Sequence, residues 1–292
     1  MVNTSLRRPC VVFLTKAGRS VRRACELVGM SRSGFSYLQR RQIDPELIER
    51  IKAIAKKYVR FGYRRTWAVL RREGIVVNHK AVYRIRKSLG LTLPRRKARK
   101  PRPGTAQLPC QAAYRNHVWT YDFLFDSLAD GKQLKFLTVV DEFTRVCLKI
   151  EVGTSIRSGS VITILEGLFR EHGAPRFLRS DNGPEFIAKE LRTWLGENGS
   201  QTMYIDRGSP WQNAVGESFN GKLRDEFLTM NVFYTLAEAR ILTEGYRRFY
   251  NSERPHSSLH YLTPMEFRAG VPPRALSNRN HKQLKLAVGT ET

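Results

Sequence analysis

A carboxylate stands inside a stretch of chain whose other residues favour a buried strand. Asp122 lies within residues 117–125, a run rich in β-branched and aromatic side chains that predicts a strand. Burying an ionised group is costly unless another group compensates it. The fold must therefore bring a compensating partner to Asp122.

Two further acids stand where their local patterns would expose a carboxylate. Asp181 follows the apolar run 176–180 and precedes an Asn-Gly-Pro segment, in which Gly permits a tight turn and Pro suits the first turn of a helix. Asp181 is therefore predicted at the carboxyl end of a strand. Glu217 lies in a predicted helix whose apolar residues recur every four positions, and 35 residues separate it from Asp181.

If these acids converge, they predict a metal site. The helix that carries Glu217 is expected to point the four side chains of its polar side outward: Asn213, Glu217, Asn220 and Arg224. Converged carboxylates repel one another and cannot all ionise cheaply without a cation. Oxygen ligands favour Mg²⁺ or Mn²⁺, and two such ions can drive displacement at phosphorus. The alternative is an accidental triple, since the chain has 26 acidic residues.

The positive charge of the chain is concentrated in its first part. Residues 1–117 hold 29 lysines and arginines against 5 acids, a net charge of +24, whereas residues 118–292 hold 22 against 21. Nearly all of the overall net charge of +25 therefore lies in residues 1–117. Such a block predicts a polyanion-binding surface whose affinity depends steeply on salt. A merely solvated basic surface is the alternative.

Helix signals divide this front into two predicted DNA-binding parts. Residues 1–42 hold a helix-turn-helix-like pattern, with a helix from Ser20 to Val28, a turn, and a second helix capped by Ser31. Residues 43–92 hold a helix capped by Asp44 and a helix pair, 66–72 and 79–88, the second of which Asn78 would cap. The second helix of that pair would present three basic side chains on its outer side, Lys80, Arg84 and Lys87. Such helices can enter a major groove, although packing without base contact, or docking to RNA or protein, would produce the same pattern.

A basic linker is predicted over residues 93–116. It has too few apolar groups to fold alone and enough like charge to stay extended. Its basic run consists of Arg95, Arg96, Lys97, Arg99 and Lys100. We interpret this run as tracking DNA, with a plain spacer as the alternative.

Residues 117–276 predict an α/β core. Strands at 117–125, 134–140 and 146–152 are expected to pair antiparallel. A helix around 161–169, the strand at 176–180, a helix at 184–197 and a short strand near 202–205 follow. Crossover helices between the later strands predict parallel pairing, with helices on both faces of the sheet. Further helices are expected at 235–250 and after a capping box at 263–266, and the tail 277–292 is predicted to be disordered.

The sequence frames around the three acids resemble a known family. They are Trp119-x-x-Asp122, Ser180-Asp181-Asn182-Gly183-Pro184-Glu185-Phe186 and Asn213-x-x-x-Glu217-x-x-x-x-x-x-Arg224, followed by Tyr250-Asn251-x-x-Arg254-Pro255-His256. Nearly the whole chain is similar to three-carboxylate (DDE) transposases and retroviral-type integrases, most closely the second-frame (OrfB) transposase of two-frame bacterial insertion sequences. The resemblance implies a ribonuclease H-like, retroviral integrase-like mixed sheet with flanking helices, preceded by an all-α helix-turn-helix-type DNA-binding region.

The resemblance also implies an activity and its residues. Asp122, Asp181 and Glu217 would be the catalytic ligands of two Mg²⁺ or Mn²⁺ ions, while Asn182, Asn213 and Arg224 would position DNA. The implied function is DNA transposition: binding of terminal inverted repeats, cleavage by water, and attack of the freed 3′-hydroxyl on another strand, with DNA recombination and integration as the result. Partners would be element-end and target DNA, further copies of the chain in at least a dimer, and an upstream-frame (OrfA) product or fusion.

Several assignments stay open from the residues alone. Asp126 shares a strand face with Asp122 and could replace it as the ligand, although the Trp119 frame favours Asp122. His256 is interpreted as structural, with substrate contact as the alternative. A DNA-binding regulator with an inactive core, or a structure-selective nuclease on the same fold, would contain the same acids.

Other classes of protein fit the sequence less well. The four cysteines, Cys10, Cys25, Cys110 and Cys147, include no closely spaced pair, so neither a zinc site nor a disulfide framework is expected. No apolar run is long enough to span a membrane and no secretory pattern begins the chain. We therefore expect a cytoplasmic protein on the nucleoid.

Overall fold

A computed structural model describes residues 4–36, 44–94, 111–180, 183, 189–204 and 210–272. The chain divides into two compact units, Met1–Ala53 and Ile54–Thr292. The predicted junction at residues 42 and 43, most of the predicted linker and the predicted tail lie outside the described residues. In the part that is described, no helix is long and apolar enough to cross a membrane.

The first unit contains three short helices packed on one small core. They are α1 (Thr4–Lys16), α2 (Val21–Val28) and α3 (Arg32–Ser36). Ser20, predicted as the first residue of the helix, instead caps α2 by accepting a hydrogen bond from the Arg23 amide, and Ser31, predicted as a cap, accepts one from the amide of Gly34. Gly29 ends α2 in the left-handed conformation, which glycine adopts without steric cost. The helix α1 was not predicted from the sequence, and its Val11 is fully buried against α2.

A second group of helices follows. They are α4 (Pro45–Lys57), in which the boundary between the units falls, α5 (Tyr63–Arg72) and α6 (His79–Ser88). Asp44 and Asn78 cap α4 and α6 as predicted, accepting hydrogen bonds from the amides of Glu46 and Lys80. The helix predicted from residue 66 begins earlier, at Tyr63. Buried Arg86 of α6 reaches Thr66 of α5, and this contact joins the predicted helix pair.

The core of the second unit is a five-stranded mixed sheet with the order β3-β2-β1-β4-β5. Its strands are β1 (Val118–Ser127), β2 (Gln133–Asp141), β3 (Cys147–Gly153), β4 (Phe177–Ser180) and β5 (Gln201–Tyr204). The first three pair antiparallel, and β4 and β5 add in parallel. These are the pairings predicted from the sequence, because short turns permit antiparallel neighbours while parallel neighbours need a crossover.

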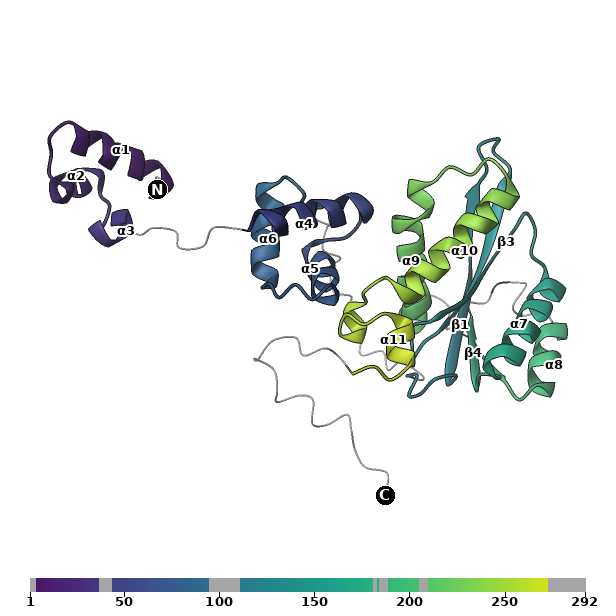
Figure 1. Ribbon diagram of the computed structural model, residues 1–292. Helices are drawn as coiled ribbons and strands as arrows, with labels where there is room; N and C mark the ends of the chain where they lie inside the picture. Colours follow the sequence, from purple (N-terminus) through teal and green to yellow (C-terminus); the bar gives the residue numbers. More distant parts are fainter. Residues whose placement is uncertain are drawn as a thin grey trace, which may run out of the picture. The chain divides into compact units, whose positions relative to one another are not determined.

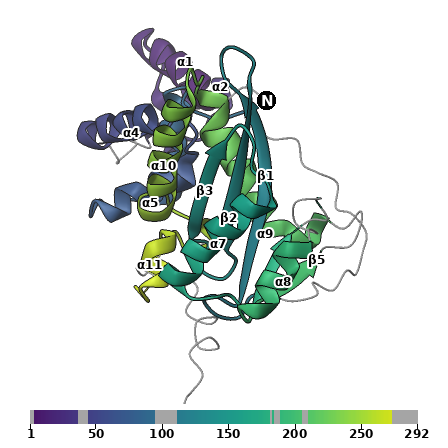
Figure 2. The same cartoon turned by 90° about the vertical axis from the view of Figure 1, so that its right-hand side faces the viewer.

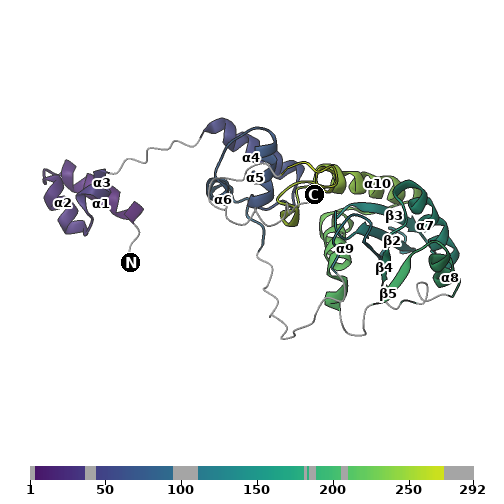
Figure 3. The same cartoon turned by 90° about the horizontal axis from the view of Figure 1, so that it is seen from below.

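Helices cover both faces of this sheet, as Figure 1 shows. On one face pack α7 (Ser158–His172) and α8 (Lys189–Glu197), and on the other α9 (Ala214–Glu226) and α10 (Leu236–Ser252). Figures 2 and 3 show the same two layers from other sides. Side chains of β1 contribute to a hydrophobic core on each face of the sheet. Trp119 and Tyr121 pack against α7 and α8, whereas Leu124 packs with α9 and α10. The architecture is the ribonuclease H-like, integrase-like core that the sequence predicts.

Shorter elements complete the C-terminal side. They are the 3-10 turns η1 (Pro210–Asn213), η2 (Leu228–Met230) and η3 (Ser257–Leu259) and the helix α11 (Pro264–Arg268). The predicted capping box of α11 is present, with Thr263 and Glu266 bonding each other's backbone amides. Asn251 at the end of α10 donates to and accepts from the backbone of Cys147 on β3, at 2.8 and 2.9 Å. The Tyr-Asn-x-x-Arg-Pro-His segment therefore anchors α10 to the sheet.

Candidate active site

Asp122 lies on the face of β1 that is covered by α9. Its carboxylate is partly buried, and its Oδ2 accepts a hydrogen bond of 2.7 Å from Nδ2 of Asn220 on α9. Its Oδ1 accepts from the backbone amide of Phe123 at 2.8 Å. A half-buried acid is thereby held in one orientation by neutral donors, which supply the compensation that its position requires.

Asp126 shares this face but has different surroundings. It pairs with Leu134 near the hairpin end of β1, and its Oδ1 accepts from the backbone amide of Ser127 at 2.9 Å. No hydrogen bond between Asp126 and α9 occurs in the described residues, whereas Asp122 is bonded to that helix. The geometry favours Asp122 as the acid that works with α9.

Asp181 and Asn182 lie outside the described residues, but the strand that precedes them is described. β4 ends at Ser180 and runs parallel to β1, with Arg179 opposite Thr120. Arg179 forms a two-pronged ion pair of 2.8 and 2.9 Å with Glu142, and both side chains are only 4% exposed. The carboxyl end of β4 is thus fixed beside the half of β1 that leads to Asp122.

Glu217 lies in the first turn of α9 and is exposed. A negative side chain is favoured there because the aligned peptide dipoles make a helix N-terminus positive. The helix approaches the sheet very closely one residue earlier, since a Cβ on Gly216 would lie 2.7 Å from Oγ1 of Thr120. Glu217 precedes Asn220 by about one helical turn, so the helix that holds Asp122 also carries Glu217.

The two amides of α9 correct the expectation of an outward polar face. Asn213 and Asn220 are 3% and 8% exposed, and both turn toward the sheet. Asn213 accepts a hydrogen bond from Thr120 Oγ1, and Asn220 accepts from Thr138 Oγ1 at 3.1 Å while donating to Asp122. Amides can satisfy both donors and acceptors in a buried site, so they join helix and sheet. Glu217 and Arg224 are exposed, as predicted.

Two residues that support the site were not identified from the sequence, Thr120 and Gly216. Thr120 looks like an ordinary β-branched strand residue, and nothing in its local pattern marks it. Gly216 offered a signal, because glycine inside a helical pattern often marks a close approach of backbone to another element.

The residues present fit a divalent cation by the chemistry of their donors. Asp122 and Glu217 offer carboxylate oxygens, the ligands that Mg²⁺ and Mn²⁺ prefer. A hydrogen bond from Asn220 orients one oxygen of Asp122 and leaves a carboxylate with lone pairs to share. Within the described residues no three acids or histidines come together as a metal site, and Asp181 is not among those residues.

The predicted DNA contacts occupy different places. Lys80, Arg84 and Lys87 are exposed on α6, as expected for a helix that meets DNA. Arg224 is exposed in the last turn of α9. The basic run 95–100 lies outside the described residues.

Comparison with known proteins first defines the class. Residues 112–210 and 198–264 match family models described as "Integrase core domain", and residues 42–99 match one described as "HTH-like domain". The chain is thus an integrase-core protein with an HTH-like domain before the core.

Individual relatives narrow this to one family. The chain is 42% identical to the Insertion element IS407 uncharacterized 31.7 kDa protein of Burkholderia multivorans, over 87% of this chain and 92% of that protein. It is 40% identical to the Insertion element IS476 uncharacterized 39.2 kDa protein of Xanthomonas euvesicatoria, over 89% and 75%. It is 28% identical to the putative transposase InsK for insertion sequence element IS150 of Escherichia coli, over 72% and 77%. The chain belongs to the insertion-sequence transposase family of OrfB-like proteins with an integrase core.

Proposed function

We propose that this protein cuts the ends of its insertion sequence and joins them to other DNA, with Asp122, Asp181 and Glu217 as ligands of two divalent metal ions. The observation that carries the proposal is the hydrogen bond from Asn220 to Asp122, because it ties the strand that bears one acid to the helix that bears another. The family and its integrase core support the same chemistry.

Each residue has a distinct part in the proposed mechanism. The three carboxylates would hold the metals, which, when bound, would activate the attacking oxygen and stabilise the leaving oxygen. Asn220 orients Asp122, and Asn213 with Thr120 holds the start of α9 against β1. Arg224 is free to meet a DNA phosphate because it is exposed seven residues after Glu217. Asn182 is proposed to contact DNA beside Asp181.

The proposed partners follow from the reaction. DNA would be bound by the exposed basic side of α6, by the basic run of residues 95–100 and by the first helical unit. Two element ends must meet for joining, so at least two copies of the chain would act together. An upstream-frame OrfA product or fusion would contribute further DNA-binding and dimerising segments.

The test uses labelled element-end DNA and Mg²⁺ with four variants. Asp122→Asn, Asp181→Asn and Glu217→Gln are expected to bind DNA like the wild type but to lose cutting and joining by about 10³-fold or more, the range for removal of a principal catalytic group. Asp126→Asn is the matched control and should keep its activity. Strand transfer that survives in Glu217→Gln would falsify the assignment.

Two other outcomes would identify the alternatives. Products that are cut but never joined, in the wild type as well, would indicate a structure-selective nuclease. DNA binding without any reaction would indicate a regulator of transposition with an inactive core.

A further inference from the structure

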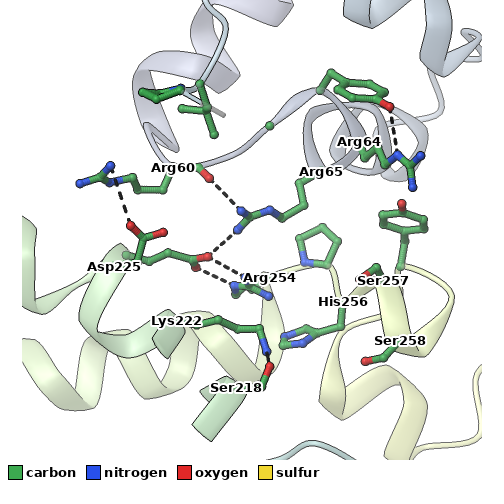
Figure 4. Close-up of a pocket in the computed structure, with 17 residues that line it drawn as sticks. Arg60, Arg64, Arg65, Ser218, Lys222, Asp225, Arg254, His256, Ser257 and Ser258 are labelled. Carbon is green, nitrogen blue, oxygen red and sulfur yellow. Dashed lines mark hydrogen bonds and ion pairs between the residues drawn. The ribbon is translucent and has the colours of Figure 1, made fainter. Parts of the chain in front are cut away.

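A cavity of about 760 Å³ lies within the second unit, apart from Asp122. Figure 4 shows the side chains that surround it. They come from the start of α5, from one side of α9 after Glu217, and from the turn that follows α10. The proposed mechanism makes no use of this cavity, although Ser218, the residue after Glu217, is part of its wall.

Most of the positive groups in its wall already have acidic partners. Arg65 and Arg254 both contact Glu226, with closest distances of 2.6 Å. Arg60 lies 3.9 Å from Asp225. These ion pairs hold α5 and the turn after α10 to the C-terminal half of α9, and because Arg65 and Arg254 share the one carboxylate of Glu226, they leave one positive charge in excess.

Lys222 differs from these arginines. Its Nζ donates a hydrogen bond of 2.7 Å to Ser218 Oγ, and no carboxylate lies within ion-pair distance of it in the described part of the chain. Burial, together with the positive charge of Arg254, lowers the pKa of Lys222 to about 8. An ammonium removed from water without a counter-ion is energetically unfavourable, and a bound anion would correct this.

A helix start faces the same cavity. Gly62, the N-cap of α5, provides no side-chain acceptor for the first amides of the helix. Gly62, Tyr63, Arg64 and Arg65 all line the cavity. Unsatisfied N–H groups and the positive end of the helix dipole make such a helix start favourable for an anion.

His256 adds a buried polar atom without a partner. The residue is 3% exposed and lines the cavity, and its Nε2 has no hydrogen-bond partner among the residues described. Burial and the charges of Arg254 and Lys222 lower its pKa to about 2, so the ring is neutral. Figure 4 shows the ring of His256 beside the end of Lys222. A hydrogen bond from its ring to the backbone of Tyr250 uses the one N–H of the neutral imidazole, so Nε2 can only accept, and His256 is a neutral part of the wall that does not hold an anion.

We propose that this cavity binds one backbone phosphate of the DNA that passes Glu217, held by Lys222 and the start of α5. The proposal rests on the proposed function, because DNA is the anion that would reach both Glu217 and its neighbour Ser218. Free inorganic phosphate has the same chemistry, so the test must separate the two sources. One phosphate contact would place the strand in register with the carboxylates while carrying no base information.

The test measures binding of duplex DNA to the full chain against salt concentration, with EDTA present so that nothing is cut. Each phosphate that a lysine neutralises contributes about one to the slope of log K against log salt. Lys222→Gln should therefore lower the slope by about one. Lys222→Arg should keep it, because the charge remains. Lys132→Gln, which removes an exposed lysine of the β1–β2 turn, should leave it unchanged.

A second arm uses inorganic phosphate alone and follows the thermal unfolding of each variant. If phosphate stabilises the wild type but not Lys222→Gln, while their DNA slopes are equal, the site is for free phosphate and the DNA assignment is overturned. A third arm adds Mg²⁺ and measures cutting. If the wild type cuts DNA but the wild type and Lys222→Gln have equal salt slopes, the phosphate site is overturned and the proposed function is not. If the salt slopes of the wild type and Lys222→Gln differ but the wild type does not cut DNA, the proposed function is overturned and the phosphate site is not. Variants are compared only after cooperative unfolding shows that they are folded.

Discussion

The two ends of α9 both carry a glutamate, and the two glutamates are used differently. Glu217 in the first turn is exposed, and its surroundings are oriented by neutral amides that bond the sheet. Glu226 in the last turn is 6% exposed at its side chain and is bonded by Arg65 and Arg254. Two arginines therefore neutralise the charge of Glu226, whereas the carboxylate of Glu217 stays accessible to a ligand.

Partners therefore decide the role of each acid. Burial alone would favour the neutral form of Glu226, but hydrogen bonds and the charges of Arg254 and Arg65 hold its pKa below the usual value. Such an acid stabilises the structure and cannot also ligate a metal. At the other end of α9, amides fix the helix without a formal charge, so the carboxylates there can serve a cation.

The largest expected effect on stability comes from Glu226→Gln. Removing one member of a buried ion-pair network leaves the remaining charges uncompensated, at a cost of about 3 to 5 kcal/mol. Denaturant unfolding should show this loss, while Glu217→Gln, the same change at the other end of α9, should cost no more than about 1 kcal/mol, the contribution of a charge at a helix N-terminus. Equal stability of the two variants would contradict the contrast between the two ends.

A smaller effect is expected where α9 touches β1. In Gly216→Ala the new Cβ would lie 2.7 Å from both Thr120 Oγ1 and Asn213 Oδ1, so their hydrogen bond must shift. We expect a loss of about 1 to 3 kcal/mol, typical of overpacking, together with weaker cutting because Glu217 moves. The control is Gly221→Ala on the same helix, where nothing lies within 4 Å of an added Cβ. It should stabilise the protein by about 0.5 to 1 kcal/mol.

The smallest expected effect is a pH dependence from Lys222. Its folded pKa of about 8 lies below the ordinary 10.5, so between these values the unfolded chain binds a proton that the folded chain does not. Stability contributed by this group must then rise with pH from about 8 to 10.5. Urea unfolding of the wild type and Lys222→Met at pH values across this range should show a difference that grows with pH. A difference in the free energy of unfolding that does not change with pH would show that Lys222 is exposed to water and has an ordinary pKa.

Local sequence signals predicted much of the fold. Ser31, Asp44, Asn78 and Thr263 were assigned as caps, and each side chain accepts a hydrogen bond from a backbone amide of the first turn. The alternating and continuous apolar runs also identified all five strands. Such patterns succeed because caps and strand periodicity depend on residues a few positions apart. The helix α1 was not predicted, and Pro9 lies inside it, where a proline ordinarily argues against a helix.

The interior of the candidate site was harder to predict. The spacing of Asn213 and Asn220 suggested an outward polar face, but the structure buries both against β1 and β2. Which side of an amphipathic helix a neutral amide joins depends on the polar atoms that the sheet offers. Thr120 and Thr138 supply those atoms from 93 and 82 residues away in sequence.

By itself the sequence determined the order of the five strands and of the helices after α1, the concentration of positive charge in residues 1–117, and the three acids with their sequence frames. These follow from side-chain chemistry and from spacing along the chain. Only the tertiary structure decided that Asn220 bonds Asp122, that Glu226 is enclosed by two arginines, and that Lys222 lacks an acidic partner in the described part of the chain. These outcomes depend on contacts between distant segments, and no local pattern encodes which charges will meet when a chain packs.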